Sequence, residues 1–149
     1  MPDIRIKFAK DKAPLAKALR SKEGGTGPFQ TYADVLTFGA VLGFHHQNRI
    51  PFQQGSRKDP DAVPADQFKN QAIIDLIAIA TVQDPRILQN TDEILQEKAK
   101  IFEEYANGGF EILSSQVNGV TDLSKQILII IQSVKNSTSS DDIDVLSFL

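Results

Sequence analysis

Two pairs of adjacent residues carry the side chains that most often do chemistry in proteins. His45 and His46 are the only histidines of the chain, but neighbouring side chains on a helix point about 100° apart, which disfavours their convergence on one metal ion. Glu103 and Glu104 would act as a general acid–base pair only in a cleft that raises one pKa. Nothing in the sequence indicates such a cleft. We therefore expect the histidines to cap the end of a helix and the glutamates to face solvent.

The chain contains no cysteine, which excludes a disulfide framework, a thiolate metal site and a cysteine nucleophile together. This composition is typical of a protein of the reducing cytoplasm. Asp75 is the remaining acid of interest, because it lies within an apolar stretch. Such an acid most often pairs with a basic residue or a backbone amide. The sequence therefore predicts no catalytic residue, no metal ligand and no cofactor, and a protein that is not an enzyme.

Basic and acidic residues are distributed unevenly along the chain. Residues 1–58 contain ten Lys and Arg against four Asp and Glu, a net charge of +6. Residues 59–149 contain six Lys and Arg against fifteen Asp and Glu, a net charge of -9. Such asymmetry indicates either a basic binding face on an acidic body or two halves that neutralise each other within one fold.

Residues 4–8 alternate between apolar and basic side chains, which predicts a half-buried strand with Arg5 and Lys7 facing outward. A single strand cannot satisfy its own backbone donors and acceptors, so it needs a partner. The partner is either a copy of the same strand across a dimer axis or an irregular segment such as residues 50–52. The sequence slightly favours the dimer, and we expect a homodimer.

A basic strand followed by two helices is the element order of a ribbon–helix–helix DNA-binding unit, whose ribbon enters the major groove. Amide groups near Thr31 and Tyr32, at the start of the second helix, could hold a phosphate, although Asp34 in that turn would repel it. The alternative is a plain strand with a solvated basic face. The predicted DNA contacts are six basic residues of the strand, the segment after it and a proline-containing loop at 47–65: Arg5, Lys7, Lys10, Lys12, Arg57 and Lys58.

Apolar residues at helical spacing predict about five helices. We expect them at residues 10–21, 31–46, 66–84, 91–117 and 121–134, with one further turn at 85–88. The helix at 31–46 is apolar on almost every side, so other elements must surround it. Thr31 and Asp34 form a capping-box pattern at its start.

Two segments leave alternatives open. The triplet at residues 107–109, Asn-Gly-Gly, either breaks its helix or lets another helix approach closely at Gly109. The unbroken apolar period favours the close approach. The β-branched residues 129–131 allow a strand in place of the last helix.

A chain of 149 residues fits one domain. We expect a mainly α, single compact helical domain at 1–135 with one N-terminal strand, followed by a polar and acidic tail at 136–149 whose apolar end can dock on its own or another subunit. The charged start is unlike a signal peptide, and the longest apolar run, residues 127–131, is too short to span a bilayer. We therefore expect a cytoplasmic protein without membrane contact.

Four stretches between Ile4 and Leu113 match a known family in order: IRIKFAKDKAPLAKAL, GPFQTYADVLTFGAVLGF, IDLIAIATVQDPRIL and IFEEYANGGFEIL. The segment EEYANGG is quite specific, whereas the apolar helices alone would not be. Through these stretches the chain resembles the DNA phosphorothioation-associated protein 4 family. The genes of this family accompany Dnd clusters, which modify the bacterial DNA backbone with sulfur or act on DNA that lacks the mark. The residues after Val117 carry no part of this resemblance.

The resemblance implies a bacterial cytoplasmic accessory protein with a helical fold, and it supplies no catalytic residue. Two hypotheses follow. The first is a non-enzymatic accessory protein of a phosphorothioation modification or restriction system that binds DNA through its basic half. The second is a protein–protein adaptor that engages other proteins of that system through its acidic half and apolar C-terminus, without DNA contact.

Overall fold

The computed structural model describes residues 4–21, 27–58, 60–117 and 123–137. The described elements include three single 3-10 turns, η1 (Lys10–Lys12), η2 (Ala65–Gln67) and η3 (Pro85–Leu88). The helices and strands, in chain order, are β1 (Arg5–Ile6), α1 (Ala13–Leu19), α2 (Tyr32–His45), β2 (Val63–Pro64), α3 (Ala72–Val82), α4 (Asp92–Val117) and α5 (Leu123–Ser137). Within this described part, five helices and a two-stranded antiparallel sheet confirm the predicted mainly helical fold.

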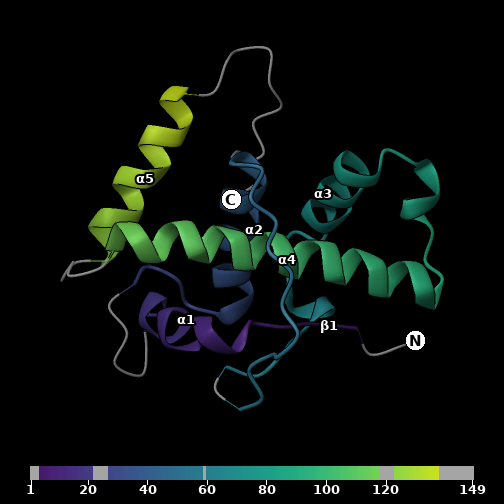
Figure 1. Ribbon diagram of the computed structural model, residues 1–149, viewed down its shortest axis with the longest axis horizontal. Helices are drawn as coiled ribbons and strands as arrows, with labels where there is room; N and C mark the ends of the chain where they lie inside the picture. Colours follow the sequence, from purple (N-terminus) through teal and green to yellow (C-terminus); the bar gives the residue numbers. More distant parts are fainter. Residues whose placement is uncertain (1–3, 22–26, 59, 118–122, 138–149) are drawn as a thin grey trace.

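The long helix α4 runs along the whole length of the molecule, and the other elements are arranged around it (Figure 1). The helix α2 crosses it near the middle, α5 and α3 lie towards its two ends, and α1 and β1 lie on one side. Thr31 caps α2 as predicted, because its hydroxyl accepts the Asp34 N–H at 3.1 Å. Nine of the fourteen residues of α2 are buried, as its apolar surface predicts.

Glycines set the close approach of α2 and α4. A Cβ atom at Gly109 of α4 would collide with the carbonyl oxygen of Gly39, and a Cβ at Gly43 of α2 would collide with the carbonyl oxygen of Tyr105. The helix α4 continues through residues 107–109 without a break. The prediction that Gly109 admits a neighbouring helix is therefore confirmed.

Residues 129–131 lie in the middle of α5, so the strand alternative is wrong. The reason is tertiary: Leu123, Ile127, Ile130 and Val134 share one face of the helix, and all four are buried. Burial of this stripe outweighs the modest β-preference of the isoleucines. The helix continues two residues past the predicted domain boundary at 135, and the rest of the predicted tail, 138–149, lies outside the described residues.

The strand β1 pairs with β2 of the same chain, with Arg5 opposite Pro64 and Ile6 opposite Val63. Of the two predicted kinds of partner, this edge has the irregular segment of the same chain, although it is residues 63–64 and not 50–52. The loop after α2 runs back antiparallel to the N-terminal segment and supplies the missing backbone bonds, including an isolated bridge between Ala9 and Gly55. A ribbon–helix–helix unit shares its ribbon between two subunits, whereas this ribbon is completed within one chain.

Two helix starts also differ from prediction. The helix α1 begins at Ala13 rather than at residue 10, since η1 occupies residues 10–12. The helix α3 begins at Ala72 rather than near residue 66, since η2 occupies residues 65–67. In the part of the chain that the structure describes, no helix has the length and apolar character needed to cross a membrane.

Candidate nucleic-acid interface

Four of the six predicted DNA contacts meet at one open groove of about 1120 Å³. Lys7 and Lys10 come from the segment before α1, and Arg57 and Lys58 come from the loop after α2. All four side chains are exposed. We call this cavity the basic groove; it is also lined by Gln53, Gln54, Ser56 and Asp61.

Backbone bonds between the two segments hold the basic groove in shape. The Lys10 N–H donates to the Gln54 carbonyl at 2.9 Å, and the Ser56 N–H donates to the Phe8 carbonyl at 2.8 Å. The strand alternation that buries Phe8 turns Lys7 outward. The stem of Lys7 passes over Gly55, where an added Cβ would lie 3.4 Å from Lys7 Cδ. The basic side chains therefore project from a fixed backbone.

Glu103 of α4 holds the N-terminal segment that carries Lys7 and Lys10 against the helix. Its carboxylate accepts the Lys7 N–H at 2.9 Å. Burial raises the pKa of the Glu103 carboxyl, and the hydrogen bond and charge of Lys7 offset part of that increase. The neighbouring Glu104 is 4% exposed and accepts from Arg49 Nε at 2.8 Å. The prediction that these two glutamates form a solvated face was wrong, because Glu103 binds the N-terminal segment at Lys7 and Glu104 binds the loop after α2 at Arg49.

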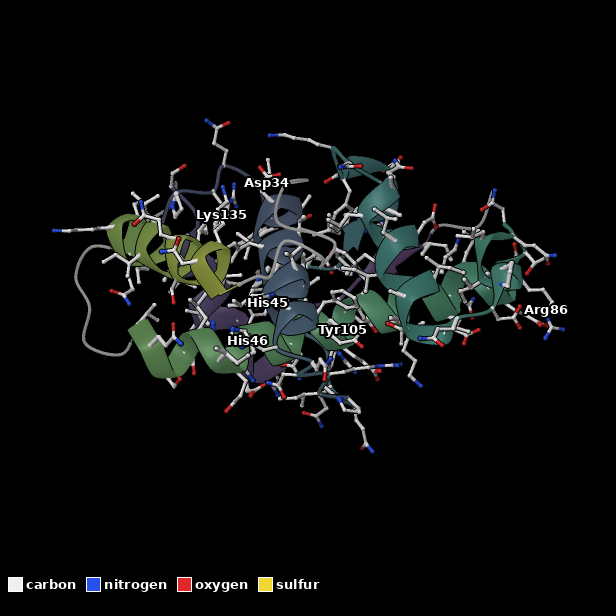
Figure 2. The ribbon with its side chains drawn as sticks, turned by 90° about the horizontal axis from the view of Figure 1, so that it is seen from above. Asp34, His45, His46, Arg86, Tyr105 and Lys135 are labelled. Carbon is white, nitrogen blue, oxygen red and sulfur yellow. The ribbon has the colours of Figure 1, made fainter. Side chains whose placement is uncertain are left out.

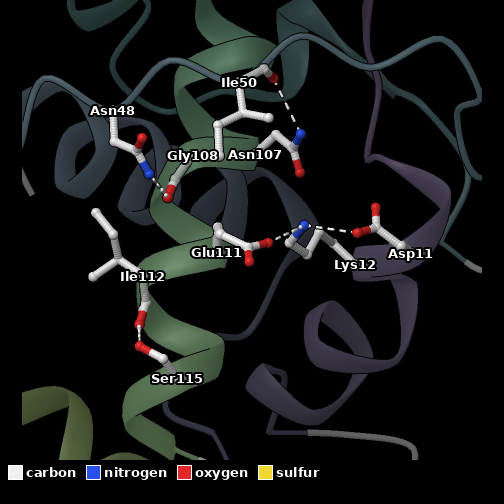
Figure 3. Close-up of polar contacts among 9 residues, drawn as sticks. All are labelled: Asp11, Lys12, Asn48, Ile50, Asn107, Gly108, Glu111, Ile112 and Ser115. Atoms are coloured by element: carbon white, nitrogen blue, oxygen red, sulfur yellow. Dashed lines mark hydrogen bonds and ion pairs between the residues drawn. The ribbon is translucent and has the colours of Figure 1, made fainter.

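Lys12 does not line the basic groove, although it was predicted to contact DNA. It is 6% exposed, and its ammonium lies 2.8 Å from Asp11 and 2.9 Å from Glu111 (Figure 3). Burial acts to lower the pKa of Lys12, but the hydrogen bonds and charges of the two acids raise it overall. The charge of Lys12 is used inside the fold. Arg5 is exposed on β1 but is not among the lining residues of the basic groove.

The distinctive segment EEYANGG docks the chain that leads from α2 to the basic groove onto α4. Asn107 donates to the Ile50 carbonyl at 3.1 Å, and Asn48 donates to the Gly108 carbonyl at 3.0 Å (Figure 3). A side chain at Gly108 would collide with the carbonyl oxygen of Asn48. Sequence reasoning missed this role, and the polar triplet within an apolar helical period was the signal that could have indicated it.

The remaining chemical candidates have structural roles. His45 ends α2 and His46 follows it, their ring centroids 5.0 Å apart on one end of the helix (Figure 2). Partial burial, and then the charge of His45, lower the pKa of His46. Asp75 pairs with the buried Lys98 at 2.9 Å, as expected. Among the described residues, no three His, Asp or Glu side chains gather as a metal site.

The start of α2, the predicted phosphate site, is already occupied by protein groups. The Asp34 N–H is bound by the Thr31 hydroxyl. The Asp34 carboxylate lies 3.3 Å from the Lys69 ammonium. The charge that would repel a phosphate is therefore partly balanced, but one of the amides that would bind it is already used.

Comparison with known proteins places the chain in a family. No curated protein and no solved structure matches it. The family model described as DNA sulphur modification system-associated protein 4 matches residues 5–148. This match includes the residues after Val117, to which the resemblance seen in the sequence did not extend. The chain therefore belongs to the family of DNA sulphur modification system-associated protein 4.

Proposed function

We propose that this chain is a non-enzymatic accessory protein of a DNA sulphur modification system and that it binds DNA through the basic groove. The observation that carries the proposal is the convergence of Lys7, Lys10, Arg57 and Lys58 on that groove from two separate segments. Among the described residues of the lining, Asp61 is the one acid, so the described side chains carry a net charge of +3. The family description favours DNA over other polyanions as the ligand.

The physical basis of this binding is the release of counterions from DNA. Each Lys or Arg that neutralises a phosphate contributes about -0.9 to the slope of log K against log salt. Four groove cations therefore give a slope of about -4, or a loss of roughly two orders of magnitude in affinity between about 50 and 200 mM salt. Binding of this kind recruits a protein to DNA without requiring any catalytic group.

The test measures binding of a short labelled duplex by fluorescence anisotropy across that salt range. The double variant Arg57→Ala/Lys58→Ala should bind more weakly at low salt, with a slope smaller in magnitude by about 2. The control Arg86→Ala/Lys135→Ala removes the same charge from exposed positions that lie on either side of α2 (Figure 2) and outside the lining of the basic groove. The proposal fails if the wild type does not bind at low salt or if the two variants lose affinity equally.

A protein–protein adaptor is the second candidate. It is favoured by Leu128 and Ile129, neighbouring apolar side chains of α5 that are 54% and 48% exposed. Under this alternative, Leu128→Ser/Ile129→Ser, or truncation after residue 137, should abolish co-purification with other proteins of the system while the fold is retained. Unchanged co-purification by both variants would exclude the adaptor surface on α5 and the tail.

A further inference from the structure

We infer that the basic groove holds one sugar–phosphate strand of a DNA duplex by its backbone alone, with Gln53, Gln54 and Ser56 as uncharged donors to phosphate oxygens. This inference rests on the proposed function and specifies how the ligand is recognised. It predicts binding that does not depend on base sequence.

The shape of the site favours the backbone over the bases. In a duplex the phosphate strands are the outermost ridges, whereas base edges lie inside the grooves and are reached by a protruding helix or β-ribbon. Here the four basic residues line a concavity, with Lys7 and Lys10 on one segment and Arg57 and Lys58 on the other. A concave surface fits a ridge, so these side chains meet phosphates.

The neighbouring ribbon is not built to read bases. The strands β1 and β2 have two residues each, and readers of this kind use three or four side chains to reach base edges. Ile6 and Val63, one residue from each strand, are buried against the molecule. The Lys7 N–H, just beyond β1, is bound to Glu103 of α4. The ribbon is therefore a support for the groove wall and does not protrude.

Three uncharged polar residues line the groove together with the basic ones. Gln53 and Gln54 are exposed and Ser56 is half-buried, and within the described part of the chain their side chains make no hydrogen bond. The backbones of Gln54 and Ser56 are fixed by bonds to Lys10 and Phe8. Amide and hydroxyl donors held next to cations are the groups that commonly bind phosphate oxygens without reading sequence.

Charged and uncharged contacts affect the salt dependence of DNA binding differently. A neutral donor displaces no counterion, so its loss lowers affinity equally at every salt concentration and leaves the slope unchanged. We therefore expect Gln53→Ala/Gln54→Ala to weaken duplex binding by about tenfold at each salt concentration, with the wild-type slope. The matched control Gln96→Ala/Gln132→Ala removes two exposed glutamines from α4 and α5 and should bind as the wild type does.

The experiment titrates both glutamine variants and the wild type with three labelled duplexes of equal length and different base composition, at several salt concentrations. The inference predicts affinities for the three duplexes that agree within about threefold, since mismatched base contacts would cost roughly tenfold or more each. Strong sequence preference that disappears in Gln53→Ala/Gln54→Ala would overturn backbone recognition while DNA binding itself stands. Wild-type affinity in that variant would overturn the role of the glutamines. If the wild type binds none of the three duplexes, the proposed function is contradicted as well.

Discussion

Lys12 and Glu111 come from distant parts of the chain, and their ion pair joins η1 to α4. The ammonium is buried, whereas Asp11 and Glu111 keep 72% and 57% of their side-chain surface exposed. Lys12 thus extends from the interior towards two solvated acids. Its sequence context, a basic run after a basic strand, gave no indication of this burial because the decisive partner lies in another helix.

The variant Lys12→Ala should be destabilised by about 2 kcal/mol, since it loses a buried stem and both ion pairs. Urea unfolding followed by circular dichroism measures this loss. Lys12→Met keeps the stem and should lose less stability than Lys12→Ala. A Lys12→Ala variant as stable as the wild type would contradict a structural role for this ammonium.

The Glu103 carboxyl makes stability depend on pH. Its pKa in the fold is raised by burial, so the folded protein holds this proton more tightly than the unfolded chain does. This group's contribution to stability is therefore present below the unfolded pKa and is lost as the pH rises through the folded pKa. Glutamine can still accept the Lys7 N–H without a charge. Glu103→Gln should therefore gain stability relative to the wild type on going from pH 4 to pH 7 in denaturant titrations. An unchanged difference between the two proteins would contradict this.

At the scale of elements, the contact between α2 and α4 leaves no room for a side chain at Gly109. Gly109→Ala would gain helix propensity of about 1 kcal/mol but must push α4 away from α2. We expect a net destabilisation of about 3 kcal/mol, as measured by urea unfolding. The control Gly55→Ala places its Cβ at ordinary contact distance from its neighbours and should change stability by less than about 1 kcal/mol. Equal stability of the two variants would show that the helices can separate freely.

The helices could be predicted from the sequence because each one buries a stripe at its own local period, as α5 does with Ile127 and Ile130. The partner of β1 could not be predicted from the sequence. This partner, β2, is a two-residue strand that contains Pro64 and lies in a proline-containing loop, where no alternating pattern indicates a strand. With that partner supplied within the chain, β1 no longer gives a reason to expect a homodimer.

At the scale of the whole molecule, the fold gathers some of the basic residues that were predicted to contact DNA and separates others. Four of six lie in one groove, because the loop after α2 folds back along the N-terminal segment. That convergence depends on contacts such as Asn107 to Ile50, which dock the intervening chain on α4. Such contacts between distant residues leave no local period in the sequence, so the groove appears only in the folded chain.

The central claim is that the two walls of the basic groove bind one ligand, and the most direct measurement is the salt dependence of duplex binding. We expect the variant Lys7→Ala/Lys10→Ala/Arg57→Ala/Lys58→Ala to lose almost the entire slope of about -4 that four phosphate contacts give. The double variants Lys7→Ala/Lys10→Ala and Arg57→Ala/Lys58→Ala each remove the cations of one segment. Each should lose about half of the wild-type slope. A fourfold variant that binds with the wild-type slope would show that DNA is held elsewhere or not at all, and would contradict the account.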